Sequence, residues 1–68
     1  MNTAAQGPLL EAHRALSEAF RLLDGSLALL SDLEYAAGLD ARDGIARAMK
    51  QVGVLALFSG IRPGDLGP

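Results

Sequence analysis

Apolar residues recur at alternating steps of four and three positions through the first half of the chain. The run comprises Leu9, His13, Leu16, Phe20, Leu23, Leu27, Leu30 and Glu34, and only His13 and Glu34 in it are polar. This is the heptad spacing of a helix that packs along one face against another helix. The pattern therefore predicts an amphipathic first helix, which we expect to begin at Pro8 because proline suits the first helical position.

The triplet Asp24-Gly25-Ser26 decides where this first helix ends. Its composition is typical of a turn, yet the leucines on either side of it keep the helical phase. Gly25 falls on the outer side of the helix, where a glycine costs only about 1 kcal/mol relative to alanine. We therefore expect one continuous helix over residues 8–37. The alternative is a break at Asp24-Gly25, which would give a monomeric three-helix bundle with helices 9–23, 26–37 and 41–58.

A second helix is predicted after Gly38. Gly38 suits the left-handed position that closes a helix, and Asp40 suits the N-cap of the next one. The second helix is expected over residues 41–59, so that residues 8–59 form one helical hairpin domain. Residues 1–7 are expected to be a flexible lead. Residues 60–68 hold three glycines and two prolines and are expected to be an irregular tail.

Helices of these lengths cannot cover one another. At 1.5 Å per residue the first would be about 45 Å long and the second about 28 Å, so the first three turns of the first helix would overhang. Apolar surface left open in this way indicates an interface. The sequence therefore predicts an all-α hairpin of one long and one short helix that pairs into a homodimeric four-helix bundle. The expected interface residues are Leu9, Leu10, His13, Leu16, Phe20, Leu22, Leu29, Leu33, Val52, Leu55 and Phe58.

Length and composition narrow the classes of protein that remain. Sixty-eight residues form one domain at most, and a domain this small is marginally stable alone. The absence of cysteine excludes disulfides and thiolate metal ligands. The net charge of −2 gives no general attraction to nucleic acid or to anionic membranes. The longest apolar run, residues 52–58, is too short to span a membrane. The first residues lack the pattern of a signal peptide, so we expect a cytoplasmic protein.

Candidate chemistry is sparse in this sequence. His13 is the single histidine and could be a general base or a pH switch, but its place among apolar positions favours a packed or interface histidine. Ser17 lies four residues from His13, and no acid is placed to orient the ring. Asp32 and Glu34 are two residues apart and diverge on a helix. We therefore expect no enzyme, no cofactor, no metal and no small-molecule substrate.

The function that this pattern favours is protein–protein interaction. We expect a small regulator, such as an inhibitor, an anti-activator, a chaperone or an adaptor, whose partners are a second copy and another protein. The alternative is a dimeric nucleic-acid-binding regulator that uses Arg42, Arg47 and Lys50. That basic group is diluted by Asp40 and Asp43, and no aromatic platform for base stacking accompanies it.

Overall fold

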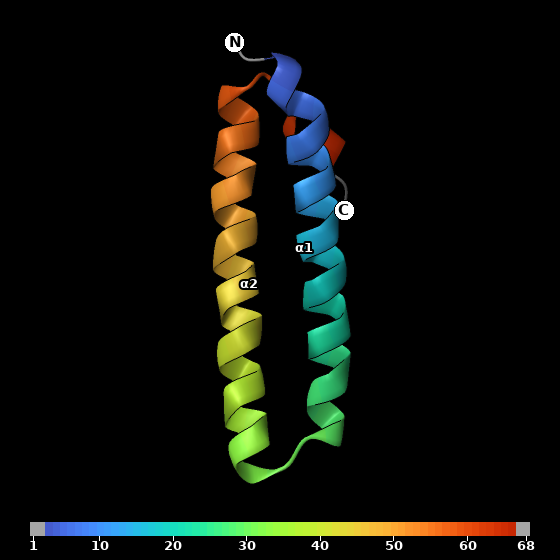
Figure 1. The fold of residues 1–68 in the computed structure, drawn as a ribbon, viewed down its shortest axis with the longest axis vertical. Helices are drawn as coiled ribbons and strands as arrows, with labels where there is room; N and C mark the ends of the chain where they lie inside the picture. Colours follow the sequence, from blue (N-terminus) through green and yellow to red (C-terminus); the bar gives the residue numbers. More distant parts are fainter. Residues whose placement is uncertain (1–2, 67–68) are drawn as a thin grey trace.

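The described part of the chain, residues 3–66, forms one long helical hairpin in the computed structural model (Figure 1). Its principal extents are 46 × 15 × 15 Å, which are those of two antiparallel helices lying side by side. The elements in chain order are the 3₁₀ turn η1 (Thr3–Ala5), α1 (Gln6–Ser26), the 3₁₀ turn η2 (Leu27–Leu29), α2 (Asp32–Phe58) and the 3₁₀ turn η3 (Pro63–Leu66). The predicted all-α hairpin is confirmed.

The connection between the helices lies just after the triplet Asp24-Gly25-Ser26. Helix α1 runs through Gly25 and ends at Ser26, whose hydroxyl donates a hydrogen bond of 2.7 Å to the carbonyl of Leu22. A serine bonded in this way competes with the helical hydrogen bonds of its own segment. Leu30 and Ser31 then adopt extended backbone conformations. The carbonyl of Ser31 accepts the N–H of Glu34 at 3.0 Å, and α2 begins.

A continuous helix over residues 8–37 is therefore wrong, and the three-helix alternative is wrong as well. The reason lies at Gly38, which we interpreted as a helix stop. Gly38 is buried inside α2, and a Cβ atom there would lie 2.8 Å from Leu27 Cδ2 and 2.8 Å from Leu30 Cδ1. The glycine marks a close approach of the turn to α2, because only a residue without a side chain leaves space for the two leucines.

The start of α2 carries a signal that the sequence analysis missed. Ser31 is followed three residues later by Glu34, which is the spacing of a capping box. Asp32 and Glu34 also place two negative charges in the first turn, next to the positive end of the helix dipole. In the structure Ser31 occupies the N-cap, although its side chain makes no capping hydrogen bond. The second helix thus begins at Asp32 instead of residue 41.

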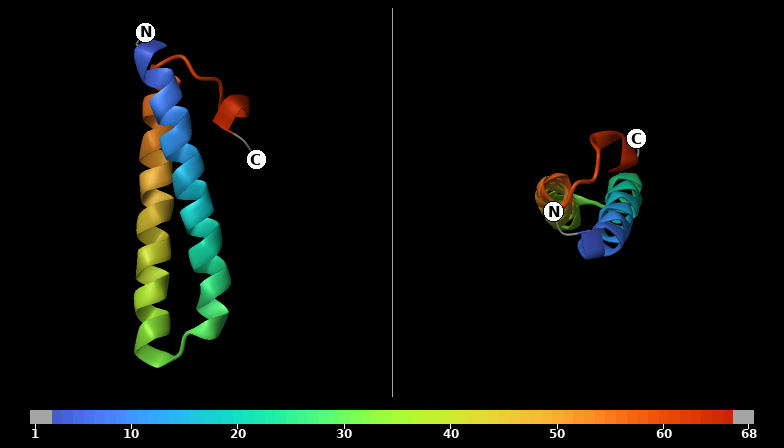
Figure 2. Two further views of the ribbon diagram at one scale, coloured as in Figure 1. Left: turned by 45° about the vertical axis from the view of Figure 1, so that its right-hand side comes forward. Right: turned by 90° about the horizontal axis from the view of Figure 1, so that it is seen from above.

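The other end of the hairpin is closed by a Schellman motif. Gly60 has a φ of 90°, its N–H reaches the carbonyl of Leu57 at 3.1 Å, and the N–H of Ile61 reaches that of Ala56 at 2.9 Å. The accompanying apolar contact joins Ile61 and Ala56, which are 5% and 0% exposed. This turn sends the chain back along the hairpin, and Figure 2 shows the C-terminal segment lying across one face of it.

The predicted overhang of the first helix is absent. Helices α1 and α2 contain 21 and 27 residues, and the side-chain amide of Gln6 donates to the carbonyl of Ser59 at 2.6 Å. The beginning of α1 therefore lies beside the end of α2. Five of the expected interface residues, all on α1, are half-buried along the helix pair: Leu9, Leu10, His13, Leu16 and Phe20. Of the expected lead and tail, residues 1–2 and 67–68 lie outside the described residues.

Candidate functional site: exposed apolar surfaces

The hairpin buries few of its apolar side chains. Within residues 3–66 the buried hydrophobic residues are Leu27, Ala56 and Ile61, and no large side chain is fully buried. Two helices touch along one line, so each can cover only one side of its neighbour. The large apolar side chains that remain exposed are Leu22 (57%), Leu29 (86%), Leu33 (86%), Tyr35 (44%), Val54 (46%), Leu55 (54%), Leu57 (50%) and Phe58 (78%).

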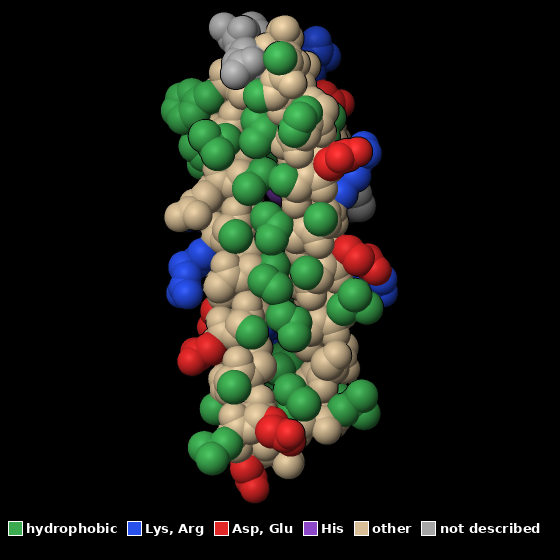
Figure 3. Space-filling view, in the orientation of Figure 1, with side chains coloured by type: hydrophobic (Ala, Val, Ile, Leu, Met, Phe, Trp, Pro, Cys, Tyr) green, Lys and Arg blue, Asp and Glu red, His purple; other side chains and the backbone are tan. Residues whose placement is uncertain are grey.

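The face turned away from the C-terminal segment has an apolar centre that runs along both helices. In Figure 3 the apolar side chains follow the junction between α1 and α2, and the charged ones gather at the two edges and at the turn. A Cβ atom at Gly53 would lie 4.0 Å from Leu66 on the opposite face. We call the apolar side the open face. Helical periodicity places on it Ala12, Leu16, Ala19 and Leu23 of α1, with Ala41, Ala48, Val52 and Leu55 of α2.

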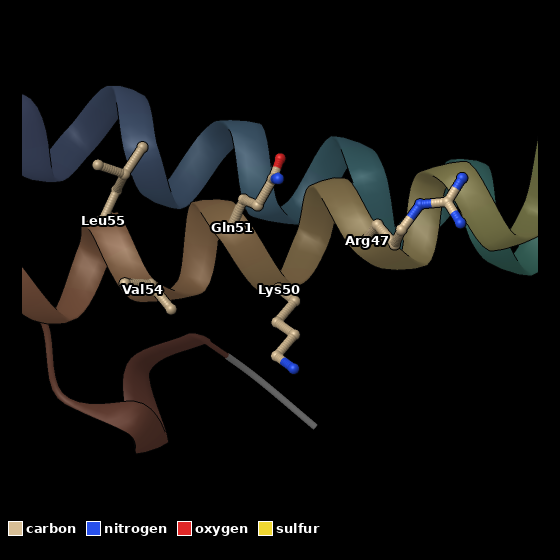
Figure 4. A pocket seen from close by; sticks show the side chains of 5 residues that line it. All are labelled: Arg47, Lys50, Gln51, Val54 and Leu55. Carbon is tan, nitrogen blue, oxygen red and sulfur yellow. The ribbon is translucent and has the colours of Figure 1, made fainter.

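A second surface follows the side of α2 that points away from α1. Its residues recur at steps of four and three over the whole helix, and we call it the outer strip. It consists of Leu33, Ala37, Asp40, Gly44, Arg47, Gln51, Val54 and Phe58, all of them exposed except the half-buried Gly44. An open groove of about 740 Å³ lies over its C-terminal half, lined by Arg47, Lys50, Gln51, Val54 and Leu55 (Figure 4).

The three basic residues of α2 are not gathered on one surface. Arg42 is turned toward α1, where its guanidinium donates to the carboxylate of Asp24 at 2.7 Å and lies 6.0 Å from the centre of the Phe20 ring. Its side chain is 29% exposed, so it is largely occupied in joining the two helices. Arg47 and Lys50 instead line the groove on the far side of α2.

The side chain of His13 lies between the helices without a catalytic partner. Its Nδ1 is buried and finds no hydrogen-bond partner within residues 3–66. The hydroxyl of Ser17, one turn further along α1, donates to Met49 Sδ at 3.4 Å instead of to the imidazole. Asp32 and Glu34 are exposed at the start of α2. In the same part of the chain no three His, Cys, Asp or Glu side chains come close enough to hold a metal ion.

A ridge of charges marks the edge of α1 away from α2. Glu18 and Arg21 form an exposed ion pair on it. The hydrogen bonds that Arg21 donates to the Glu18 carboxylate, together with the negative charge of that carboxylate, hold the pKa of Arg21 above its ordinary value. Arginine stays charged at any physiological pH with or without such a partner. The pair therefore keeps the ridge polar, and we assign it no catalytic role.

The expected interface residues divide into two groups by exposure. Leu22, Leu29, Leu33, Leu55 and Phe58 are exposed, whereas Leu9, Leu10, His13, Leu16, Phe20 and Val52 are half-buried between or beside the helices. Val54, Arg47 and Gln51 of the outer strip were missed. The heptad spacing from Leu33 to Phe58 could have identified them, but the expected start of the second helix at residue 41 divided that run.

Comparison with protein-family models, with curated proteins and with solved structures finds no match to this chain. Across residues 3–66, neither helix combines the length and the apolar character that crossing a membrane requires.

Proposed function

We propose that this chain is a small, non-enzymatic protein–protein interaction module that acts as a regulator. Its first partner is a second copy, with which it forms a homodimeric four-helix bundle, and its remaining apolar surface binds another protein. The observation that carries the proposal is the exposure of the large apolar side chains: Leu29 and Leu33 are each 86% exposed and Phe58 is 78% exposed. These side chains lie at the two ends of α2, and together with the apolar open face they indicate an interaction site.

The accessible surface supports the same conclusion. The chain exposes 4856 Å², whereas a compact monomer of 7.1 kDa is expected to expose about 4,100 Å². The difference is about 800 Å². A stable interface of standard size removes about 800 Å² from each partner. Pairing with one other copy would therefore bring the exposed surface of each chain to the value of an ordinary folded protein.

The composition of these surfaces fits a regulator that acts by covering a helix of its partner protein. The open face combines alanines with larger aliphatic residues, and small residues let a neighbouring helix approach closely. An amphipathic helix of another protein would bind such a face through its apolar side. Inhibition, escort and scaffolding all follow from covering a helix of the partner, so the proposal is of a binding protein and not of a particular pathway.

Sedimentation or light scattering at several protein concentrations tests the self-association. We expect the mass of a dimer in the micromolar range. Leu55→Glu, at the border of the open face and the outer strip, should shift the protein toward monomer. Leu57→Glu is the matched control, because Leu57 has a similar exposure of 50% against 54% but lies on the side of α2 that faces the C-terminal segment. A wild-type chain that stays monomeric at tens of micromolar would contradict the proposal.

A further inference from the structure

We propose that the second copy docks antiparallel along the outer strip of α2, with a two-fold axis beside the centre of that helix. This inference rests on the self-association proposed above and specifies its surface and its direction. The two α2 helices then lie at the middle of the assembly and each α1 lies outside them, so the four helices form one layer instead of a square bundle, and the open face stays available to another protein. The occupant of the groove in Figure 4 is the first half of the other copy's α2.

The outer strip has apolar residues at equal distances from its centre. Its spacing alternates four and three without a break over eight positions, which is the pattern of a helix that packs on another helix. The ends of the strip are apolar, with Leu33 at one end and Phe58 at the other. The middle is polar or small. When the strip is laid on a reversed copy of itself, Leu33 meets Phe58 of the second copy and Ala37 meets Val54, so both apolar ends are covered.

The charges of the strip decide the direction of pairing. Asp40 and Arg47 are both exposed and lie on opposite sides of the centre. In a parallel pair each would face the same residue of the other copy, which places like charges together. In the antiparallel pair Asp40 lies opposite Gln51 of the second copy and one turn from its Arg47, and Arg47 lies opposite Gly44. The two Arg47 side chains lie on either side of the two-fold axis, so each extends past Gly44 toward Asp40 of the other copy. Opposite charges at such positions select partner and orientation in helix pairs.

The groove on α2 can accommodate the helix of the second copy in this register. It is lined by two basic side chains, an amide and two aliphatic ones: Arg47, Lys50, Gln51, Val54 and Leu55. The segment that the antiparallel register brings there is residues 36–44, which supplies small apolar side chains and the carboxylate of Asp40. Ala37 meets Val54, and the carboxylate of Asp40 meets Gln51, one turn from Arg47. The two-fold axis repeats the arrangement, so the exposed Leu33 and Phe58 of both copies are covered together.

Single-cysteine variants test the direction of pairing directly, because the wild-type chain has no cysteine. We would prepare Leu33→Cys and Phe58→Cys as full-length chains of distinguishable mass, mix them, and oxidise them mildly. The proposal predicts a disulfide between the two different variants and little cross-linking of either variant with itself. Leu57→Cys mixed with Leu33→Cys serves as the control for random collision and should stay largely uncross-linked.

A charge exchange tests the register. Asp40→Arg and Arg47→Asp should each weaken the dimer by about tenfold or more, since each places like charges together twice across the axis. The double variant should restore the wild-type dissociation constant to within a few-fold. Far-ultraviolet circular dichroism establishes that all three variants retain the helical fold.

The outcomes separate this inference from the proposed function. Self-linking of Leu33→Cys, or a double variant no tighter than the single ones, would overturn the antiparallel register while a wild-type dimer still stood. If the dimer is indifferent to all three charge variants but is weakened by Leu16→Glu, the contact lies on the open face instead. A monomeric wild-type chain would contradict both the proposed self-association and the proposed register.

Discussion

Gly38 in α2 lies directly against the side chain of Leu27 in the turn. A Cβ atom at Gly38 would be 2.8 Å from Leu27 Cδ2, and Leu27 is itself only 7% exposed. The contact joins the turn to the helix that follows it. It also makes Gly38 a position where volume, and not helix propensity, determines the effect of a substitution.

Gly38→Leu is expected to destabilise the hairpin by about 1–3 kcal/mol, because a side chain inserted into a filled site displaces its neighbours. The matched control is Gly25→Leu. Gly25 is an exposed position of α1, and nothing lies within 4 Å of a Cβ atom built there. That control should gain stability by roughly 0.5–1 kcal/mol through helix propensity. Chemical denaturation at one fixed protein concentration measures both, because self-association adds to apparent stability. Equal effects at the two glycines would show that the contact with Leu27 does not matter.

The ion pair between Asp24 and Arg42 connects α1 to α2 at a partly exposed site, where the two side chains are 54% and 29% exposed. Asp24→Ala should lower the free energy of unfolding by under about 1 kcal/mol, and the loss should shrink in concentrated salt. Arg42→Ala should lower the free energy of unfolding by more, because the guanidinium also lies over the Phe20 ring.

Glu18→Ala is the control for this ion pair. It removes a carboxylate that binds Arg21 three residues along the same helix, so its loss should be smaller than that of Asp24→Ala. Thermal unfolding at low and high ionic strength distinguishes the variants. An Asp24→Ala protein as stable as the wild type in low salt would contradict a structural role for the pair.

Asp32 starts α2 with a φ of 50°, a conformation in which most side chains crowd the following carbonyl. Asp32→Val should destabilise the hairpin by about 1–2 kcal/mol, since a β-branched residue is poorly suited to this region. Asp32→Gly removes the same negative charge but accepts the backbone conformation. Comparing the two by urea denaturation therefore isolates backbone strain, and a valine variant no less stable than the glycine variant would refute it.

Gly60 closes α2 with a φ of 90°, and the left-handed conformation is unfavourable for alanine. Gly60→Ala should cost about 1–2 kcal/mol and should loosen the contact of Ile61 with Ala56. Hydrogen exchange at the Ile61 amide, which bonds the Ala56 carbonyl at 2.9 Å, should become faster. Gly64→Ala is the control, because nothing lies within 4 Å of a Cβ atom there. Comparable losses of stability at both glycines would mean that the left-handed conformation of Gly60 does not determine the effect.

The sequence predicted the class of fold because class depends on apolar periodicity. The steps of four and three from Leu9 to Leu27 follow from helix geometry alone, and they continue through Gly25 into the last turn of α1. What the pattern did not locate is the turn. Leu27 and Leu30 keep the helical phase, yet one is buried in the turn and the other is extended, because both pack against Gly38. That contact forms only after α2 folds back, so local sequence reasoning misread the glycine as a helix stop.

The candidate surfaces were predicted in part, for a related reason. Leu22, Leu29 and Leu33 were among the residues that the sequence placed on open apolar surface, and the structure leaves all three exposed. The outer strip was missed because it crosses the position where we expected the helix to start. Once the N-cap at Ser31 is known, the run from Leu33 to Phe58 is read directly from the sequence.

The hydrogen bond between Gln6 and Ser59 joins the start of α1 to the end of α2, so the helical pair begins and ends at the same end of the hairpin, opposite the turn. This limits how two copies can be joined in one polypeptide. A short linker between tandem copies would keep the two turns pointing the same way. A linker that allows the opposite orientation must run the 46 Å length of the molecule, which takes at least about 14 extended residues. The shortest linker at which a tandem fusion becomes more stable than its separate halves would thus show whether the two turns point the same way or in opposite directions.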